Sequence, residues 1–236
     1  MTGVRAASRA HTIHEIKRLA LLQLAQHGPS GLSLRAIARD LDMVSSGMYR
    51  YYASRDDLLT ALIIDAYEAL GRAGEQAVHD CSPDADITTR WRAAAGSARH
   101  WAQQYPEQWG LIFGTPIPDY RAPDDTVGPA SRYTTVLISL LIEREIRLGP
   151  IPVAVYEPLR PQLVDFIDRY AIPVDPSTLQ AGFTAWIQIV GAITMELFGH
   201  FHNVIEPGEQ LFAALVETHG QIIAGTNRAL PIVQTP

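Results

Sequence analysis

The sequence predicts an all-α protein, in which an N-terminal three-helix head is joined by a long helix to a larger helical bundle. Apolar residues recur at spacings of three and four along most of the chain, and no stretch shows the alternation of a half-buried strand. Charge is also unevenly distributed. The first 60 residues hold eight basic and five acidic residues, whereas the rest of the chain holds 11 basic and 20 acidic ones. We therefore expect two domains, residues 11–56 and 57–228, of which only the first meets a polyanion.

Composition excludes several classes of protein. The single cysteine, Cys81, rules out an intrachain disulfide framework and a cysteine-based zinc site. Residues 1–14 lack the apolar core of a signal peptide, and no apolar run reaches the roughly 18 residues of a membrane span. We expect a cytoplasmic protein with no membrane partner, no cofactor and no metal site.

The first helix of the head is predicted to open at Thr12, where Thr12 and Glu15 have the spacing of a capping box. It is predicted to close at Gly28-Pro29. An apolar stripe runs between these ends and can cover the helices that follow. It consists of Ile16, Leu19, Ala20 and Leu24.

Residues 33–52 are predicted to form two short helices joined by a tight turn. Leu34, Ile37, Ala38 and Leu41 line one face of the first of these helices. The second helix, residues 45–52, is too short to be stable alone and must be held by packing. Its accessible side carries small or hydrogen-bonding residues that suit a DNA major groove and its phosphates, although the two tyrosines could instead only pack. They are Ser45, Ser46, Gly47, Tyr49 and Tyr51.

A second capping box, Ser54 with Asp57, is predicted to open the long linking helix, which reaches about residue 78. The next helix carries Trp91, Trp101 and Tyr105, and Pro106 starts a further turn or two to Phe113.

Residues 114–128 form the longest irregular stretch, which is either a functional loop or disordered. Pro129 is predicted at the first turn of a helix that ends at Gly149, and a shorter helix carries Leu163 to Tyr170.

The last two helices are predicted to form half of a four-helix dimer interface. The first is capped by Asp175 and runs to about Phe201, with apolar residues nearly all round, so it must be buried on both sides. The second runs from Pro207 to about Ala224, and Gly182 and Gly191 would let another backbone approach. The residues predicted to make the dimer are Phe183, Trp186, Val190, Ile193 and Leu215. Burial within a monomer is the alternative.

The N-terminal segment, residues 12–60, resembles the TetR family of bacterial transcriptional regulators. The family pattern has a helix ending in Gly, a hydrophobic-Arg-x-Ile-Ala helix, a Leu-Tyr-x-His/Tyr-Phe helix and a basic residue before the next helix. The matching pieces here are His27-Gly28, Leu34-Arg35-Ala36-Ile37-Ala38, Met48-Tyr49-Arg50-Tyr51-Tyr52 and Arg55.

The chain departs from the family at three places. Asp42 stands in the turn where Gly is common, but Asp tolerates a left-handed backbone. Val44 replaces the frequent Ser or Thr cap, so Ser45 is expected to cap one residue later. The C-terminal part resembles the subgroup with a Trp-x-x-x-His-Gly motif, but the chain has Val190 between Trp186 and Gly191 in place of the histidine.

The resemblance implies the roles of the head residues. Ser45, Ser46 and Gly47 would face base edges, with Tyr49 nearby. Tyr51 and Arg55 would contact phosphates, and Arg35 would reach a phosphate or a base.

The resemblance also implies a ligand pocket just past the linking helix, where several aromatic residues occur. An aromatic lining suits an apolar ligand with a few polar groups, although these residues could equally be core. The expected ligand-binding residues are Trp101, Tyr105, Trp109, Phe113 and Gln188.

The sequence thus indicates a homodimeric repressor that binds a pseudo-palindromic double-stranded operator and is released by a small, largely apolar effector. Alternatives are a regulator with a protein effector, an activator, or a helical enzyme or small-molecule carrier with an incidental head. Catalytic motifs such as G-x-S-x-G and the P-loop are missing, so no enzyme is expected.

Overall fold

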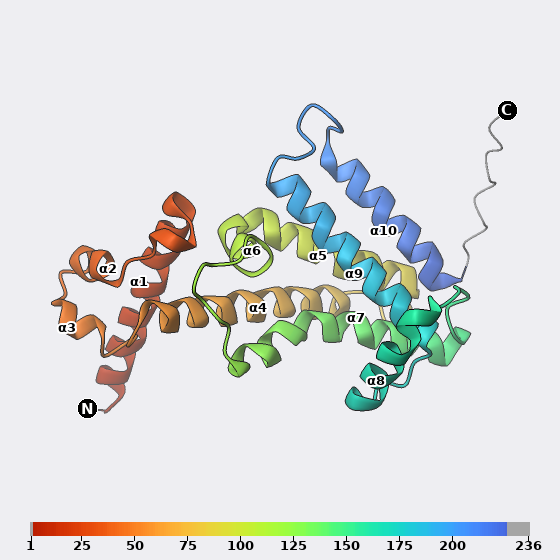
Figure 1. Cartoon of the computed structure of the whole chain (residues 1–236), viewed down its shortest axis with the longest axis horizontal. Coiled ribbons are helices and arrows are strands. Elements are labelled where there is room, and N and C mark those ends of the chain that lie inside the picture. The colour runs from red at the N-terminus through yellow and green to blue at the C-terminus, as the bar shows by residue number, and fades with distance from the viewer. Residues whose placement is uncertain (1, 226–236) are drawn as a thin grey trace. The chain divides into compact units, whose positions relative to one another are not determined.

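The structure, a computed structural model, describes residues 2–225, and these residues form helices and connecting loops without a strand (Figure 1). The α-helices are α1 (Thr2–His27), α2 (Leu34–Asp40), α3 (Ser45–Met48), α4 (Arg55–His79), α5 (Ile87–Gln104), α6 (Pro106–Phe113), α7 (Val127–Leu148), α8 (Arg160–Tyr170), α9 (Pro176–Leu197) and α10 (Gly208–Ala224). The predicted all-α class is confirmed.

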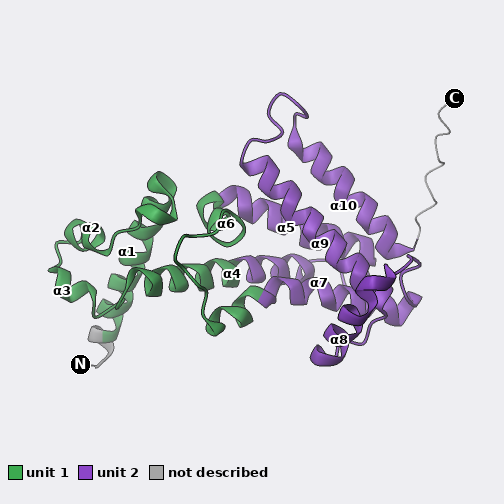
Figure 2. Cartoon of the chain, in the orientation of Figure 1, with its two compact units in different colours: residues 1–69, 105–130 green, residues 70–104, 131–236 purple. Residues whose placement is uncertain are grey.

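The chain divides into two compact units, which Figure 2 colours separately. Within the described residues, unit 1 comprises residues 2–69 and 105–130, and unit 2 comprises residues 70–104 and 131–225. The division falls within α4 and α7, and α6 belongs to the same unit as the first three helices. The predicted boundary between residues 56 and 57 stays a prediction.

Unit 1 has one hydrophobic core, to which α1, α2, α3, α4 and α6 all contribute. Its fully buried members include Ile16 of α1, Ile37 of α2 and Leu59 of α4, with Met48 of α3 only 1% exposed. Because α3 is a single turn, the burial of Met48 is what fixes it to the unit.

Helix α1 begins at Thr2, ten residues earlier than predicted, so the prediction that Thr12 opens it was wrong. The Thr12 hydroxyl lies within the helix and donates to the carbonyl of Ser8 at 3.0 Å, as threonine does in helix interiors. The preceding stretch, with Ala6, Ala7 and Ala10, has strong helix propensity and lets the helix extend. Gly28, at φ 66°, ends α1 as expected.

Helix α3 covers only residues 45–48 of the predicted 45–52. The chain continues in tight turns, in which the amides of Tyr51 and Tyr52 both donate to the carbonyl of Met48. Val44 occupies the N-cap without a side-chain cap, so the expectation that Ser45 caps this helix was also wrong. Asp42 has φ 52°, the left-handed conformation expected of the turn.

Other predicted helix ends agree with the structure. The Ser54 hydroxyl accepts from the amide of Asp57 at 3.0 Å at the start of α4. Asp175 caps α9 by accepting from the amide of Ser177 at 2.8 Å. Helix α7 differs, since it starts at Val127 after a 3₁₀ turn at Asp124–Thr126.

In unit 2, helices α5, α9 and α10 pack together and α8 packs on α9. Two buried polar side chains join helices of this unit. The Tyr133 side chain of α7 is buried and its hydroxyl donates to the carbonyl of Ala94 on α5 at 2.6 Å. The guanidinium of Arg144 is buried at the C-terminal ends of α7 and α10, and it donates to the carbonyls of Gly149 and Ile223. Burial lowers the pKa of Arg144, and the helix-end carbonyls compensate its charge.

Helix α9 ends at Leu197, four residues before the predicted end, and one of its faces is uncovered. Ala185, Ile189 and Ile193 are buried in unit 2. The opposite face carries the large exposed side chains Phe183, Ile187, Met195 and Phe198. The expectation that α9 is buried on both sides is therefore not met within one chain.

Across residues 2–225, none of the helices combines the length and apolar character needed to cross a bilayer. Within the same residues, no three His, Cys, Asp or Glu side chains come together in a way that could hold a metal ion.

Candidate nucleic-acid interface and ligand grooves

Helix α2 is positioned by its buried face and by its cap. The Ser33 hydroxyl accepts from the amide of Ala36 at 3.3 Å, and Leu34, Ile37 and Ala38 face the core of unit 1. Arg35 is left exposed on the other side of the helix. An exposed, permanently charged guanidinium is a group that suits phosphate and base edges, and the role of Arg35 in binding DNA stays a prediction.

Helix α3 presents a surface of small and hydroxyl-bearing residues. Ser45 and Ser46 are exposed, Gly47 is half-buried and the Tyr49 side chain is 47% exposed. A Cβ at Gly47 would lie 3.6 Å from Met43 Cε and 3.6 Å from Val44 Cγ2, which is ordinary van der Waals contact. The packing of this chain therefore does not demand glycine at position 47.

Tyr51 and Arg55 are both half-buried, and both have partners within unit 1. The guanidinium of Arg9 lies over the Tyr51 ring, 4.8 Å from its centroid. Arg55 Nη2 donates to the carbonyl of Pro29 at 2.7 Å, and Nη1 lies 3.4 Å from Asp56 Oδ1. Arg55 thus ties the start of α4 to the 3₁₀ turn Pro29–Gly31 that follows α1, in addition to any contact with DNA.

Sequence reasoning missed Arg9 because the first helix was expected to begin after it. The helix propensity of residues 2–11 could have indicated that α1 begins earlier. In that case Arg9 lies on the helix, where it contacts the turn that follows α3.

The predicted aromatic ligand-binding residues do not share one unit. Trp101 lies on α5 in unit 2 and is 5% exposed, whereas Tyr105, Trp109 and Phe113 belong to unit 1. Trp109 is fully buried, and its ring lies 4.5 Å from that of Phe113. Phe113 in turn meets the Tyr67 ring edge-on at 6.1 Å. Gln188 is exposed on α9. Their role in binding a ligand stays a prediction.

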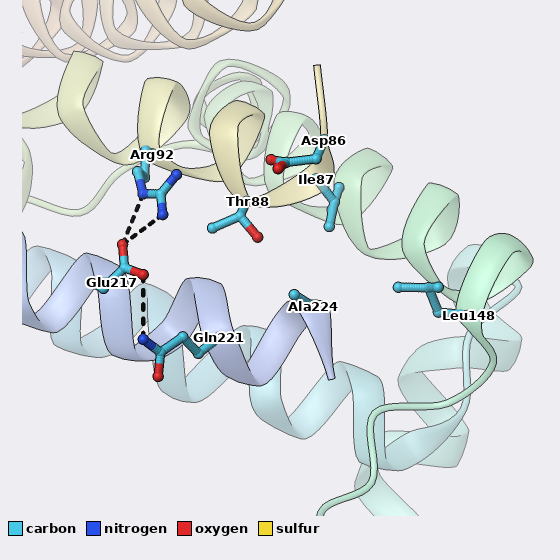
Figure 3. Close-up of a pocket in the computed structure, with 8 residues that line it drawn as sticks. All are labelled: Asp86, Ile87, Thr88, Arg92, Leu148, Glu217, Gln221 and Ala224. Atoms are coloured by element: carbon cyan, nitrogen blue, oxygen red, sulfur yellow. Dashed lines mark hydrogen bonds and ion pairs between the residues drawn. The ribbon is translucent and has the colours of Figure 1, made fainter. Parts of the chain in front are cut away.

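Two grooves lie along α5 and α10 in unit 2. The first, of about 610 Å³, is shown in Figure 3 and lies where α5 starts and α10 ends. Its polar side is an ordered network, in which Arg92 donates twice to Glu217 Oε2 and Gln221 donates to Glu217 Oε1. The hydrogen bond from Arg92 lowers the pKa of Glu217. The other lining residues are Asp86, Ile87, Thr88, Leu148 and Ala224.

The second groove, of about 600 Å³, continues along the same two helices and shares Arg92 and Glu217 with the first. Gly96, His100 and Phe212 line it. Arg99, also in the lining, forms a two-pronged ion pair with Glu196 of α9 at 2.6 and 2.8 Å. Both grooves have the volume of small-molecule sites.

The predicted dimerisation residues are exposed to different degrees. Phe183 is 40% exposed, and Trp186, Val190 and Leu215 are half-buried, with the Trp186 ring 5.1 Å from that of Tyr133. Ile193 is 1% exposed and packs inside unit 2. Sequence reasoning omitted Ile187, Met195 and Phe198, which are exposed on the same face as Phe183, because the pattern does not tell which face of an all-apolar helix its own chain covers.

Both the N-terminal and the C-terminal part of the chain match models of known protein families. Residues 17–62 match the family model described as bacterial regulatory proteins, tetR family, and residues 91–219 match the model described as tetracyclin repressor-like, C-terminal domain. The HTH-type transcriptional regulator Rv1816 of Mycobacterium tuberculosis is 38% identical over 206 residues, which cover 84% of this chain and 86% of that protein. Mb1846 of Mycobacterium bovis, described in the same words, matches equally well.

Solved structures agree with these relatives. The crystal structure of SCO4313 superposes with a TM-score of 0.77 at 30% identity, over 91% of this chain and 97% of that one. A protein from Rhodococcus sp. RHA1 shares the fold, with a TM-score of 0.68 at 19% identity, over 89% of this chain and 94% of that one. With a helix-turn-helix in unit 1 and relatives that are regulators rather than enzymes, the chain belongs to the TetR family of bacterial transcriptional regulators.

Proposed function

We propose that the protein is a homodimeric repressor that places α3 in the major groove of a pseudo-palindromic operator and is released by a small effector. The observation that carries the DNA-binding part is the surface of α3. Ser45 and Ser46 of α3 and Tyr49 directly after it are accessible, and Gly47 is not required by internal packing. Small residues over a rigidly buried Met48 allow the helix backbone to come close to DNA.

Phosphate contacts in this proposal come from Arg35, Tyr51 and Arg55 around α3. Side chains of this kind fix the orientation of a head on the duplex, and base edges are then read from α3. Two heads in a dimer would bind half-sites about one DNA turn, roughly 34–36 Å, apart.

The DNA-binding proposal is tested by selecting bound duplexes from a random-sequence library with the protein. We expect a two-fold symmetric site whose affinity falls as salt rises. Tyr49→Ala should weaken binding to that site at least tenfold. The matched control is Tyr170→Ala on α8, which removes another tyrosine that is 58% exposed. Failure to enrich any sequence, or equal binding by the two variants, would count against the proposal.

The exposed face of α9 supports the homodimer. Phe183, Ile187, Gly191 and Met195 are each four residues apart and form one row, which Phe198 continues. A Cβ at Gly191 would meet nothing within 4 Å, so the middle of this row is open to a second copy. Gly182, by contrast, already faces the Leu141 side chain of α7 in the same chain. A self-complementary row of this kind suits a two-fold axis.

Light scattering on the protein and its variants tests the dimer. We expect Ile187→Asp to give a monomer, because an unpaired carboxylate would be buried at the contact. Ile146→Asp on α7 is the matched control, since Ile146 is 77% exposed but lies outside the row. A wild-type monomer, or an unchanged dimer in Ile187→Asp, would overturn this part of the proposal.

Release by a small, largely apolar effector is supported by family membership and by the two grooves of unit 2, whose volumes suit such a molecule. Screening a compound library by thermal shift should find compounds that stabilise the protein. Those compounds should then weaken operator binding by about 5- to 150-fold. If stabilising compounds leave DNA binding unchanged, the effector is better sought among proteins.

A further inference from the structure

Helix α1 extends beyond the part that packs in the core of unit 1, and Arg9 lies in this extension. Its guanidinium carbon is 4.8 Å from the centroid of the Tyr51 ring, within the distance of a cation–π contact. Its Nη2 also donates to the carbonyl of Arg50 at 3.4 Å. Two contacts from one side chain therefore reach Arg50 and Tyr51, which lie in the turn that follows α3.

Tyr51 lies in the turn directly after α3 and is hydrogen-bonded to its last residue. Its amide donates to the carbonyl of Met48 at 2.9 Å, which fixes the backbone, and its side chain is half-buried against the core of unit 1. A half-buried tyrosine at the end of a tight turn keeps some freedom of its side-chain torsions. A guanidinium over one face of the ring restricts that freedom, and a contact with the ring face does not use the phenolic hydroxyl as a hydrogen-bond partner.

We propose that Arg9 is a positioning residue of the DNA interface, which holds the Tyr51 ring in the orientation from which its hydroxyl contacts a phosphate. This inference rests on the proposed function, because it takes Tyr51 as a phosphate contact. Arg9 acts before DNA arrives: it lowers the entropy that Tyr51 would otherwise lose on binding. The hydrogen bond to the Arg50 carbonyl holds the guanidinium in its position over the Tyr51 ring.

Measuring operator affinity by fluorescence anisotropy for a double-mutant cycle tests this inference. The DNA is the duplex selected by the wild-type protein. Arg9→Ala should bind about two- to fivefold more weakly than wild type, the size of an exposed cation–π contact. Arg9→Lys should recover part of the loss, because an ammonium keeps the attraction to the ring but cannot present a planar guanidinium to it.

The decisive comparison is made in the Tyr51→Ala background. If Arg9 acts through Tyr51, Arg9→Ala has no further effect there. The control for removal of a positive charge is Arg18→Ala, since Arg18 lies further along the same helix and is paired with Glu15. An equal loss from Arg9→Ala in both backgrounds would show that Arg9 contacts the DNA directly and would overturn the positioning role.

A readout without DNA separates positioning from simple stabilisation. In the free protein, the NMR signals of the Tyr51 ring should shift in Arg9→Ala and stay in place in Arg18→Ala, while the thermal midpoints of both remain those of the wild type. Unchanged ring signals in Arg9→Ala would refute the inference. Failure of the wild-type protein to select any duplex would instead refute the proposed function, so the two failures are distinguishable.

Discussion

The Tyr133 hydroxyl donates a 2.6 Å hydrogen bond to the carbonyl of Ala94, and this bond joins α7 to α5 inside unit 2. The Tyr133 side chain is 2% exposed, and burial raises its pKa, so the phenol is a neutral donor. The same carbonyl also accepts from the Ser97 hydroxyl at 2.7 Å. Tyr133 therefore contributes mainly through its ring, which fills space against Trp186 at 5.1 Å.

Two variants of Tyr133 separate these contributions. Tyr133→Phe should lower the free energy of unfolding by only about 1 kcal/mol, since Ser97 keeps the Ala94 carbonyl bonded. Tyr133→Ala should lower it by about 3–5 kcal/mol, the usual effect of deleting a buried aromatic ring. Urea denaturation followed by tryptophan fluorescence is suited to the measurement, because Trp91, Trp101 and Trp186 all lie in unit 2. Equal losses in the two variants would show that the hydrogen bond, not the ring, dominates.

Gly74 of α4 is required by the same tyrosine. A Cβ at Gly74 would lie 2.8 Å from Cδ2 and Cε2 of the Tyr133 ring, which is held by its bond to Ala94 and cannot easily move away. Gly74→Ala should therefore destabilise by about 1–3 kcal/mol, despite the better helix propensity of alanine.

Gly96 of α5 is the matched control for Gly74. A Cβ there would meet nothing within 4 Å, so Gly96→Ala should stabilise by up to about 1 kcal/mol. Both free energies come from the same urea titration, and effects of the same sign in the two variants would contradict this account.

The turn of the helix-turn-helix gives a test in unit 1. Asp42 holds φ 52°, a conformation that glycine adopts freely and a β-branched residue resists. Asp42→Gly should therefore leave the stability of unit 1 unchanged or raise it by up to about 1 kcal/mol, whereas Asp42→Val should lower it by about 1–2 kcal/mol. Amide hydrogen exchange of Ile37 and Met48 measures this locally. Similar exchange in the two variants would mean that the turn bears no strain.

Sequence reasoning was most successful where one residue decides a local geometry. Gly28, Asp42, Ser54 and Asp175 were each assigned a role in a turn or cap, and each has that role in the structure. These positions depend on backbone conformation and on hydrogen bonds between near neighbours, both of which a sequence states directly.

Sequence reasoning failed where a local motif was present but the neighbouring residues favoured another structure. Thr12 and Glu15 have the spacing of a capping box, but the alanine-rich residues before them continue the helix. The same limit applies to the candidate sites. Trp101 and Trp109 were interpreted as one aromatic cluster at a predicted ligand pocket, yet they belong to different units, which divide between Gln104 at the end of α5 and Tyr105 before α6. The element against which a buried aromatic side chain packs depends on residues that are far away in the sequence.

Acid should weaken unit 2 through its surface carboxylates. The hydrogen bond from Arg92 lowers the pKa of Glu217, and the hydrogen bond from Arg132 lowers the pKa of Glu75. A carboxyl group with a lowered pKa in the folded state stabilises that state above its unfolded pKa, near 4.3, and loses this contribution as pH falls through the lowered value. The thermal midpoint should therefore fall below about pH 5, and less steeply in Glu217→Gln than in the wild type. An identical profile for the two proteins would exclude Glu217 from the acid response.

Gly47 should show opposite effects on stability and on DNA binding. Position 47 lies within α3 and has room for a Cβ at 3.6 Å from Met43 and Val44, so Gly47→Ala should stabilise unit 1 by about 0.5–1 kcal/mol. If the α3 backbone approaches DNA closely at this point, the same methyl group should weaken operator binding by at least tenfold.

Ala36→Gly on α2 is the reverse control: it should lower stability by a similar amount, with little change in the affinity of the folded fraction. Circular dichroism and anisotropy on the same samples measure both quantities. A Gly47→Ala variant that is more stable and binds as tightly as the wild type would show that neither fold nor DNA requires glycine here, and the recognition surface would then have to be sought in Ser45, Ser46 and Tyr49 alone.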